Sequence, residues 1–125
     1  MRDFRQLQVW EKSHALVLAV YASTQRLPKE EMFGLTSQIR RAVVSIPANI
    51  AEGCGKEGDP EFRRYLLIAM GSASELEYLL MLAHDLKYLE DANYQSLQGI
   101  LVETRRMLNS LIMKVKPSKH LALGG

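Results

Sequence analysis

The chain has 125 residues, which is enough for one compact domain, and 47% of them are hydrophobic, too many for an intrinsically disordered protein. The net charge of +2 is milder than that of dedicated nucleic-acid-binding domains, so it permits RNA or DNA binding without requiring it. Because the chain has a single cysteine, no run of about 18 apolar residues and no apolar signal-peptide core, we expect a cytoplasmic protein without a disulfide or a membrane partner.

The first periodic segment covers residues 8–27. Its apolar positions recur at steps of three and four residues, which is typical of one buried face of a helix. Leu27 precedes Pro28, and the residue before a proline is pushed out of the α region, so we expect the helix to end there. The buried stripe is predicted to contain Trp10, Leu16, Val17, Val20, Tyr21, Thr24 and Leu27.

The second segment covers residues 34–52 and contains Pro47. A proline inside a helix removes one backbone donor and clashes with the preceding turn, so the helix either ends at Ile46 or continues with a kink. The apolar stripe continues past the proline and favours the kink. Gly53 or Gly55 would then close the helix with a left-handed cap. The predicted stripe is Leu35, Ile39, Val43, Ile46 and Ile50.

The third segment is predicted to run over residues 60–88, with Asp59 as its N-cap and Pro60 in the first helical position. It carries two apolar stripes, so it should contact more than one neighbour. The first stripe is Leu66, Ala69, Ala73, Leu76, Leu80 and Ala83, and the second is Tyr65, Ile68, Leu79, Leu82 and Leu86.

The fourth segment covers residues 92–116 and has a coiled-coil-like seam of Tyr94, Leu97, Leu101, Thr104, Leu108, Leu111 and Val115. Four amphipathic segments with short connections predict an all-α, antiparallel up-and-down four-helix bundle over residues 1–116. We expect residues 117–125 to form a disordered tail.

None of the chemical motifs in the sequence comes with the context it needs. Gly53-Cys54-Gly55-Lys56-Glu57-Gly58 matches G-x-G-x-x-G, but it follows a helix, whereas dinucleotide folds place it after a strand. Glu11 and His14 have the E-x-x-H spacing of di-iron bundles, but no second half-site is present. Cys54 has no activating partner nearby in sequence. We therefore predict no enzyme, no metal site and no cofactor.

Polar residues interrupt the apolar stripes of the second and third helices. They recur at helical spacing on the second helix, and a carboxylate on the third, Glu75, would need an arginine partner if buried. A structural Arg–Glu network that fixes helix register is the favoured interpretation, and a ligand or RNA groove is the alternative. The predicted network residues are Ser45, Asn49, Glu52, Ser72 and Glu75.

Arginines occur in three adjacent pairs along the chain. Such charges usually form solvated helix faces, and acidic residues are interspersed among them, but several weak patches could combine in an oligomer to bind phosphate. The candidate nucleic-acid-binding residues are Arg40, Arg41, Arg63, Arg64, Arg105 and Arg106.

Three stretches of the sequence together resemble one known protein family. The opening Phe4-x-x-Leu7-x-Val9-Trp10, the block GLTSQIRRAVVSIPANIAEG over residues 34–53, and Phe62-x-x-Tyr65-Leu66-x-x-Ala69-x-Gly71-Ser72-x-x-Glu75-Leu76-Glu77 resemble the bacterial 23S rRNA intervening-sequence protein family. The resemblance covers about residues 4–115. It implies a four-helix bundle that assembles into a ring-like homopentamer, and no known reaction. A related group, the accessory proteins of diversity-generating retroelements, implies nucleic acid and protein as partners.

Two hypotheses of different classes follow. The first is a non-enzymatic, oligomeric bundle associated with RNA, and the second is a scaffold that binds protein partners without nucleic acid. The second apolar stripe of the third helix would be either the homo-oligomer interface or the partner surface. We also expect Gly71 to allow a close approach of the kinked second helix, so that Gly71→Leu would overpack the bundle.

Overall fold

The computed structural model describes residues 2–115 and residue 117. Within them, the chain forms four α-helices, two short 3-10 helices and no strand. The predicted tail, apart from Pro117, lies outside the described residues. The helices are α1 (Gln8–Thr24), α2 (Leu35–Cys54), α3 (Gly58–Asp85) and α4 (Asp91–Lys114), and the 3-10 helices are η1 (Phe4–Gln6) and η2 (Lys29–Glu31).

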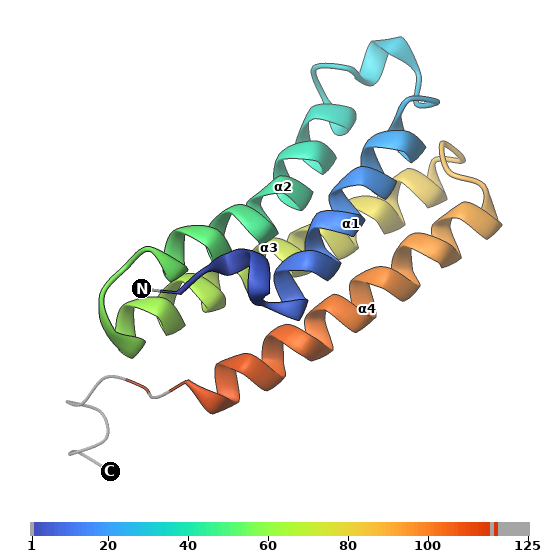
Figure 1. Cartoon of the computed structure of the whole chain (residues 1–125). Coiled ribbons are helices and arrows are strands. Elements are labelled where there is room, and N and C mark those ends of the chain that lie inside the picture. The colour runs from blue at the N-terminus through green and yellow to red at the C-terminus, as the bar shows by residue number, and fades with distance from the viewer. Residues whose placement is uncertain (1, 116, 118–125) are drawn as a thin grey trace.

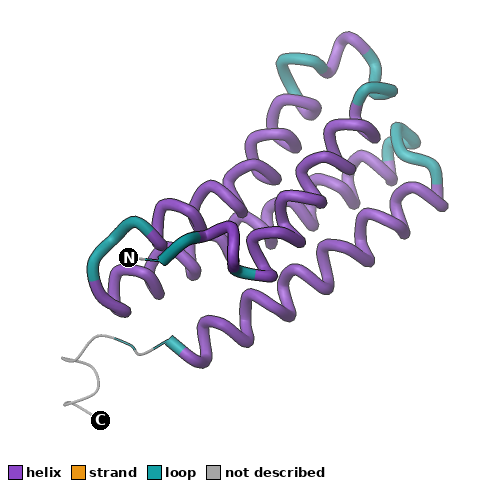
Figure 2. The backbone as a smooth tube through the Cα atoms, in the orientation of Figure 1, coloured by secondary structure: helices purple, strands orange, loops and turns teal. Residues whose placement is uncertain are grey.

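Each helix packs against two others. α2 packs against α1 and α3, and α4 packs against α1 and α3, so the four helices form a closed square with the most extensive contact between α2 and α3. Successive helices run in opposite directions and are joined at the ends of the bundle (Figure 1). The tube in Figure 2 shows that the loops are confined to those ends. The predicted fold, an antiparallel up-and-down four-helix bundle, is confirmed.

The predicted stripes of α2 and α4, and the first stripe of α3, build the core. The α2 stripe and the first α3 stripe are completely buried, and four central residues of the α4 seam, Leu97 to Leu108, are buried with them. The α1 stripe is buried at four positions, whereas Tyr21 is exposed and Trp10 and Val17 are partly buried. The periodicity of the apolar residues therefore predicted which faces meet.

Two helix boundaries differ from the prediction for identifiable reasons. α3 begins at Gly58, whose φ is +79°, and Asp59 does not cap it; the carboxylate of Asp59 instead accepts a hydrogen bond from the Arg2 guanidinium at 2.5 Å. α3 also ends at Asp85, three residues early, because Lys87 adopts a left-handed φ of 67° and reverses the chain.

The ends of α1 and α4 also differ from the prediction. α1 ends at Thr24 before Leu27 is reached, and α4 runs from Asp91 to Lys114. The Thr24 hydroxyl donates to the carbonyl of Val20 at 2.8 Å and accepts a hydrogen bond from Arg40 Nε at 2.9 Å.

α2 passes through Pro47 and ends at Cys54, so the interpretation in which the helix stops at Ile46 is wrong. Gly55 follows the last turn, but its φ of −83° is right-handed. The expected left-handed glycine cap is therefore absent from this helix end.

The close contact between α2 and α3 lies at Gly53 and not at Gly71. A Cβ atom on Gly53 would lie 2.8 Å from Cβ of Tyr65 and 3.3 Å from the carbonyl oxygen of Phe62, whereas a Cβ on Gly71 would meet nothing within 4 Å. The prediction that Gly71→Leu would overpack the subunit is therefore wrong. Gly71 lies on an exposed part of α3.

α3 is unusually apolar for a helix in so small a bundle. By length and composition only, it could cross a membrane: an 18-residue window has a mean hydropathy of 1.5, although just 39% of that window is buried. A core helix of a soluble protein meets the same criterion. α3 here packs against α2 and α4 and also carries three glutamates, Glu61, Glu75 and Glu77. Much of its apolar surface therefore remains outside the subunit core.

Candidate nucleic-acid interface

Arg40, on the inner flank of α2, is held within the subunit. Its Nε donates to Thr24 Oγ1 at 2.9 Å, and its guanidinium carbon lies 4.6 Å from the ring centroid of Tyr21. This arginine therefore joins α2 to α1 through a hydrogen bond and a cation–π contact.

Three of the other five candidate arginines are paired with glutamates. Arg64 binds Glu61 through Nε at 3.0 Å and through a second nitrogen at 3.2 Å. Arg105 bridges α4 to Glu77 on α3, and Arg106 pairs with Glu103 one turn before it. Each charge is compensated, which weakens the attraction of a phosphate to these positions.

Arg63 and Arg41 complete the set. Arg63 is partly buried, and its Nε is enclosed without a hydrogen-bond partner. Arg41 is exposed and forms no ion pair within the part of the chain that the structure describes. Of the six candidate arginines, Arg41 is therefore the one best placed to contact an anionic ligand.

The structure brings three of the five predicted network residues together. The Ser45 and Ser72 hydroxyls lie 2.8 Å apart and join α2 to α3, and the Asn49 amide donates to Ser45 Oγ at 2.9 Å and to the Ser45 carbonyl at 2.8 Å. Glu75 and Glu52 are exposed, and no ion pair joins either of them to an arginine among the described residues. The contact is a small neutral network and not the expected Arg–Glu network.

Two hollows on the surface each contain two cationic residues and no acidic residue. The first, which we call the α2 groove, has a volume of about 620 Å³ and lies along α2 beside the α1–α2 connection. It is lined by Tyr21, Met32, Phe33, Thr36, Ser37, Arg40, Arg41, Val44 and Ser45.

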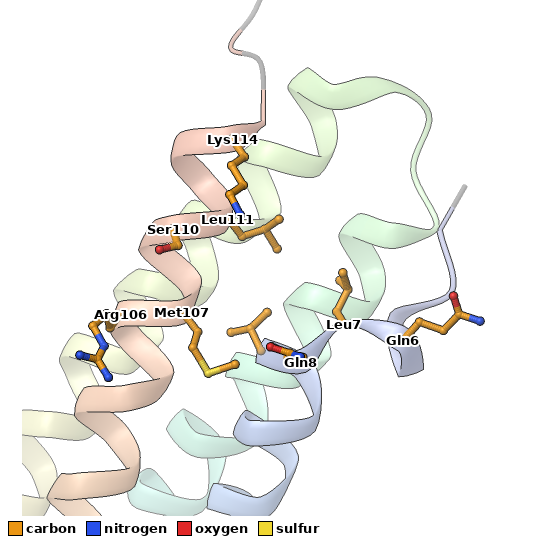
Figure 3. A pocket seen from close by; sticks show the side chains of 9 residues that line it. Gln6, Leu7, Gln8, Arg106, Met107, Ser110, Leu111 and Lys114 are labelled. Atoms are coloured by element: carbon orange, nitrogen blue, oxygen red, sulfur yellow. The ribbon is translucent and has the colours of Figure 1, made fainter.

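The second, which we call the terminal hollow, has a volume of about 400 Å³. Figure 3 shows side chains of α4 on one side of it and those of the η1–α1 segment on the other. It is lined by Gln6, Leu7, Gln8, Val9, Arg106, Met107, Ser110, Leu111 and Lys114. A ligand or RNA groove on the second helix was the alternative predicted from the sequence, and the α2 groove contains its Arg40, Arg41 and Ser45. The terminal hollow was missed, because it joins segments that are distant in the chain.

A third hollow continues the α2 groove toward α3. It has a volume of about 360 Å³ and is lined by Gln38, Arg41, Ala42, Ser45 and Glu75. Arg41 and Ser45 line both hollows, so these two residues lie where the hollows meet.

An apolar seam on the outer face of α3 was also missed. Leu67, Gly71, Ser74, Tyr78 and Met81 are exposed and step by four, three, four and three residues, as in a coiled coil. Leu67 is 46% exposed and Tyr78 is 55% exposed. The predicted second stripe lay one position away: its Ile68 and Leu86 are exposed, whereas its Leu79 is buried at 4% exposure. The α3 seam therefore lies beside the stripe that the periodicity indicated.

The residues considered for catalysis are not arranged for it. The His14 ring stacks on Trp10 with centroids 5.1 Å apart, and no group of three potential metal ligands occurs in the described chain. The glycine motif spans the end of α2, the connection and the first residue of α3, with no strand before it.

Cys54 is the one thiol in the sequence, and it is buried. Burial raises the pKa of the Cys54 thiol above its ordinary value, and the nearby Arg2 charge opposes this with a smaller effect. The thiolate is the reactive form, so its population at neutral pH falls as this pKa rises. We expect the native protein to react with a thiol reagent at least about tenfold more slowly than the urea-unfolded chain does, as measured by absorbance. Equal rates in the two states would show that Cys54 is accessible.

Comparison with known proteins adds two findings. A family described as "23S rRNA-intervening sequence protein" has a sequence model that matches residues 5–110. A crystal structure of a protein of unknown function from the S23 ribosomal protein family of Bacteroides thetaiotaomicron is similar, with 30% identity and a TM-score of 0.76. The alignment covers 83% of this chain and 97% of that chain. No curated protein matches the sequence.

Proposed function

This chain belongs to the 23S rRNA-intervening sequence protein family, and we propose that it is a non-enzymatic, oligomeric RNA-binding protein of the cytoplasm. One observation carries the proposal within the structure. The α2 groove and the terminal hollow each contain one cation without an ion pair among the described residues, Arg41 in the first and Lys114 in the second. Each also offers hydroxyl or amide groups, and neither is lined by a carboxylate. Guanidinium, ammonium and hydroxyl groups are the usual donors to phosphate oxygens.

The exposed seam on α3 supports self-association. It presents Leu67, Tyr78 and Met81 around two small residues, Gly71 and Ser74, which would let a second helix approach closely. The resemblance to the family sets the proposed number of subunits at five. A ring contains one copy of each weak cationic hollow per subunit. Several copies can therefore bind one RNA molecule at once, which raises the avidity of the oligomer for RNA.

The test is a titration of a fluorescent hairpin RNA, followed by anisotropy, between about 50 and about 200 mM salt. We expect the logarithm of the association constant to fall linearly with the logarithm of the salt concentration, because phosphate binding releases counterions. Arg41→Gln should weaken binding and make that slope shallower by about 1 for each phosphate lost. Arg64→Gln is the matched control, since its charge is already bound to Glu61.

An equal loss of affinity in both variants would remove Arg41 as the phosphate contact. No binding by the native protein, even at the lowest salt concentration, would contradict the RNA proposal. The seam on α3 would then favour the second candidate, a scaffold that binds protein partners without nucleic acid.

A further inference from the structure

Phe33 is the most exposed large apolar side chain in the described structure, at 94%. It stands at the edge of the α2 groove beside Met32 and Val44, which are also exposed, and Tyr21 lines the same groove. A single exposed apolar residue is ordinary, but four gathered around one hollow form a surface suited to a planar ligand.

The turn that carries Phe33 is fixed on both sides. The Glu31 carboxylate accepts hydrogen bonds from the backbone nitrogen of Leu35 at 3.2 Å and from the Tyr88 hydroxyl at 3.2 Å. The backbone nitrogen of Gly34 also donates to the Glu31 carbonyl at 3.0 Å. Glu31 joins this turn to the start of α2 and to the α3–α4 connection. These hydrogen bonds hold the backbone that carries the exposed Phe33 ring in place.

The polar side of the groove suits a phosphodiester. Arg41 follows Ser37 by one helical turn and precedes Ser45 by another, so the three lie in a row on one face of α2. The guanidinium of Arg40 is occupied by Tyr21 and Thr24, which leaves Arg41 as the exposed cation. The Ser45 hydroxyl is engaged by Ser72 and Asn49, so the groove places an exposed aromatic ring beside two phosphate donors, Ser37 and Arg41.

We propose that the α2 groove binds one unpaired nucleotide of single-stranded RNA, with its base stacked on Phe33 and its phosphate bound by Arg41. This site rests on the RNA-binding function proposed above and specifies its ligand. A nucleobase presents a π-face to an aromatic ring, and such stacking tolerates any sequence. A duplex offers no free base face, so this site selects unpaired RNA over duplex RNA.

The test measures anisotropy with two fluorescent probes, a single-stranded oligouridylate and a blunt RNA duplex of equal length. Phe33→Ala should weaken binding to the single strand by about 5- to 150-fold and leave its salt slope unchanged, because stacking displaces no counterions. Phe33→Trp should bind the single strand about as tightly as the native protein does, since tryptophan keeps an aromatic face. Leu18→Ala is the control, because Leu18 is an exposed leucine on α1 that lies outside the groove.

Two binding outcomes and one change in mass would overturn this site while leaving the RNA-binding function intact. One is native-like binding of the single strand by Phe33→Ala, and the other is an equal loss of affinity for the single strand and the duplex. A lower particle mass for Phe33→Ala by light scattering would also overturn it, because Phe33 would then be a contact between subunits. If the native protein binds neither probe, the proposed function itself fails.

Discussion

Replacement of Gly53 with leucine should lower the free energy of unfolding by about 3 kcal/mol, the upper end of the usual cost of overpacking. Gly53 is buried in the last turn of α2, where a Cβ atom would approach Cβ of Tyr65 at 2.8 Å and Cδ1 of Phe62 at 3.2 Å. The third contact is a backbone carbonyl oxygen at 3.3 Å, which cannot turn aside as a flexible side chain can. The end of α2 would therefore have to move away from α3.

The displacement would disturb the N-terminal segment as well. The backbone nitrogen of Arg2 donates to the Cys54 carbonyl at 3.0 Å, and its guanidinium carbon lies 4.1 Å from the ring centroid of Phe62. Both contacts depend on the close approach of α2 and α3 at Gly53. The substitution should thus loosen one whole end of the bundle.

Urea unfolding followed by circular dichroism, at one fixed protein concentration, measures this effect. Gly99→Ala on α4 is the matched control, because a Cβ there meets nothing within 4 Å. It should raise the free energy of unfolding by about 0.5–1 kcal/mol, since alanine loses less backbone entropy in a helix than glycine does. A Gly53→Leu variant as stable as the native protein would disprove the close approach.

Gly53 and Gly71 show which feature of the packing the sequence did not reveal. Both glycines lie within helices, and the sequence offered no means of telling which one faces a neighbouring backbone. That choice depends on how α2 and α3 are rotated against each other, and the rotation is set by the packing of many side chains. The apolar period predicted the core positions of α2 and α4 because it depends only on helix geometry within one segment.

Candidate sites were harder to predict for the same reason. Adjacent arginines looked equivalent in sequence, yet Arg40 is bound to α1 while Arg41 is exposed. Consecutive helical residues point about 100° apart, so a pair cannot share one environment. Phe33 carried a usable signal, since a phenylalanine between Met32 and Gly34, just before the start of α2, lies outside any apolar stripe. The polar contacts between helices, such as Ser45 with Ser72, needed the fold itself.

Replacing Leu67 and Tyr78 together with aspartate should dissociate the proposed oligomer to subunits of 14.2 kDa. Both side chains belong to the exposed α3 seam, so the single subunit does not need them for its core. A subunit contact would bury them, and burying an unpaired carboxylate costs several kcal/mol per site. Size-exclusion chromatography with light scattering gives the mass, and circular dichroism should show an intact helical fold.

Val102→Asp serves as the matched control for the seam. Val102 is 58% exposed on α4, comparable to Tyr78, but it lies outside the α3 seam, so its replacement should leave the mass unchanged. Leu79 is unsuitable despite its place in the predicted stripe, because at 4% exposure a charge there would unfold the subunit and could not report on assembly. A native protein that is already a 14.2 kDa monomer would contradict self-association. An oligomer of unchanged mass after both substitutions would instead place the interface on another face, and the apolar surface of α3 would then be free to bind a different protein.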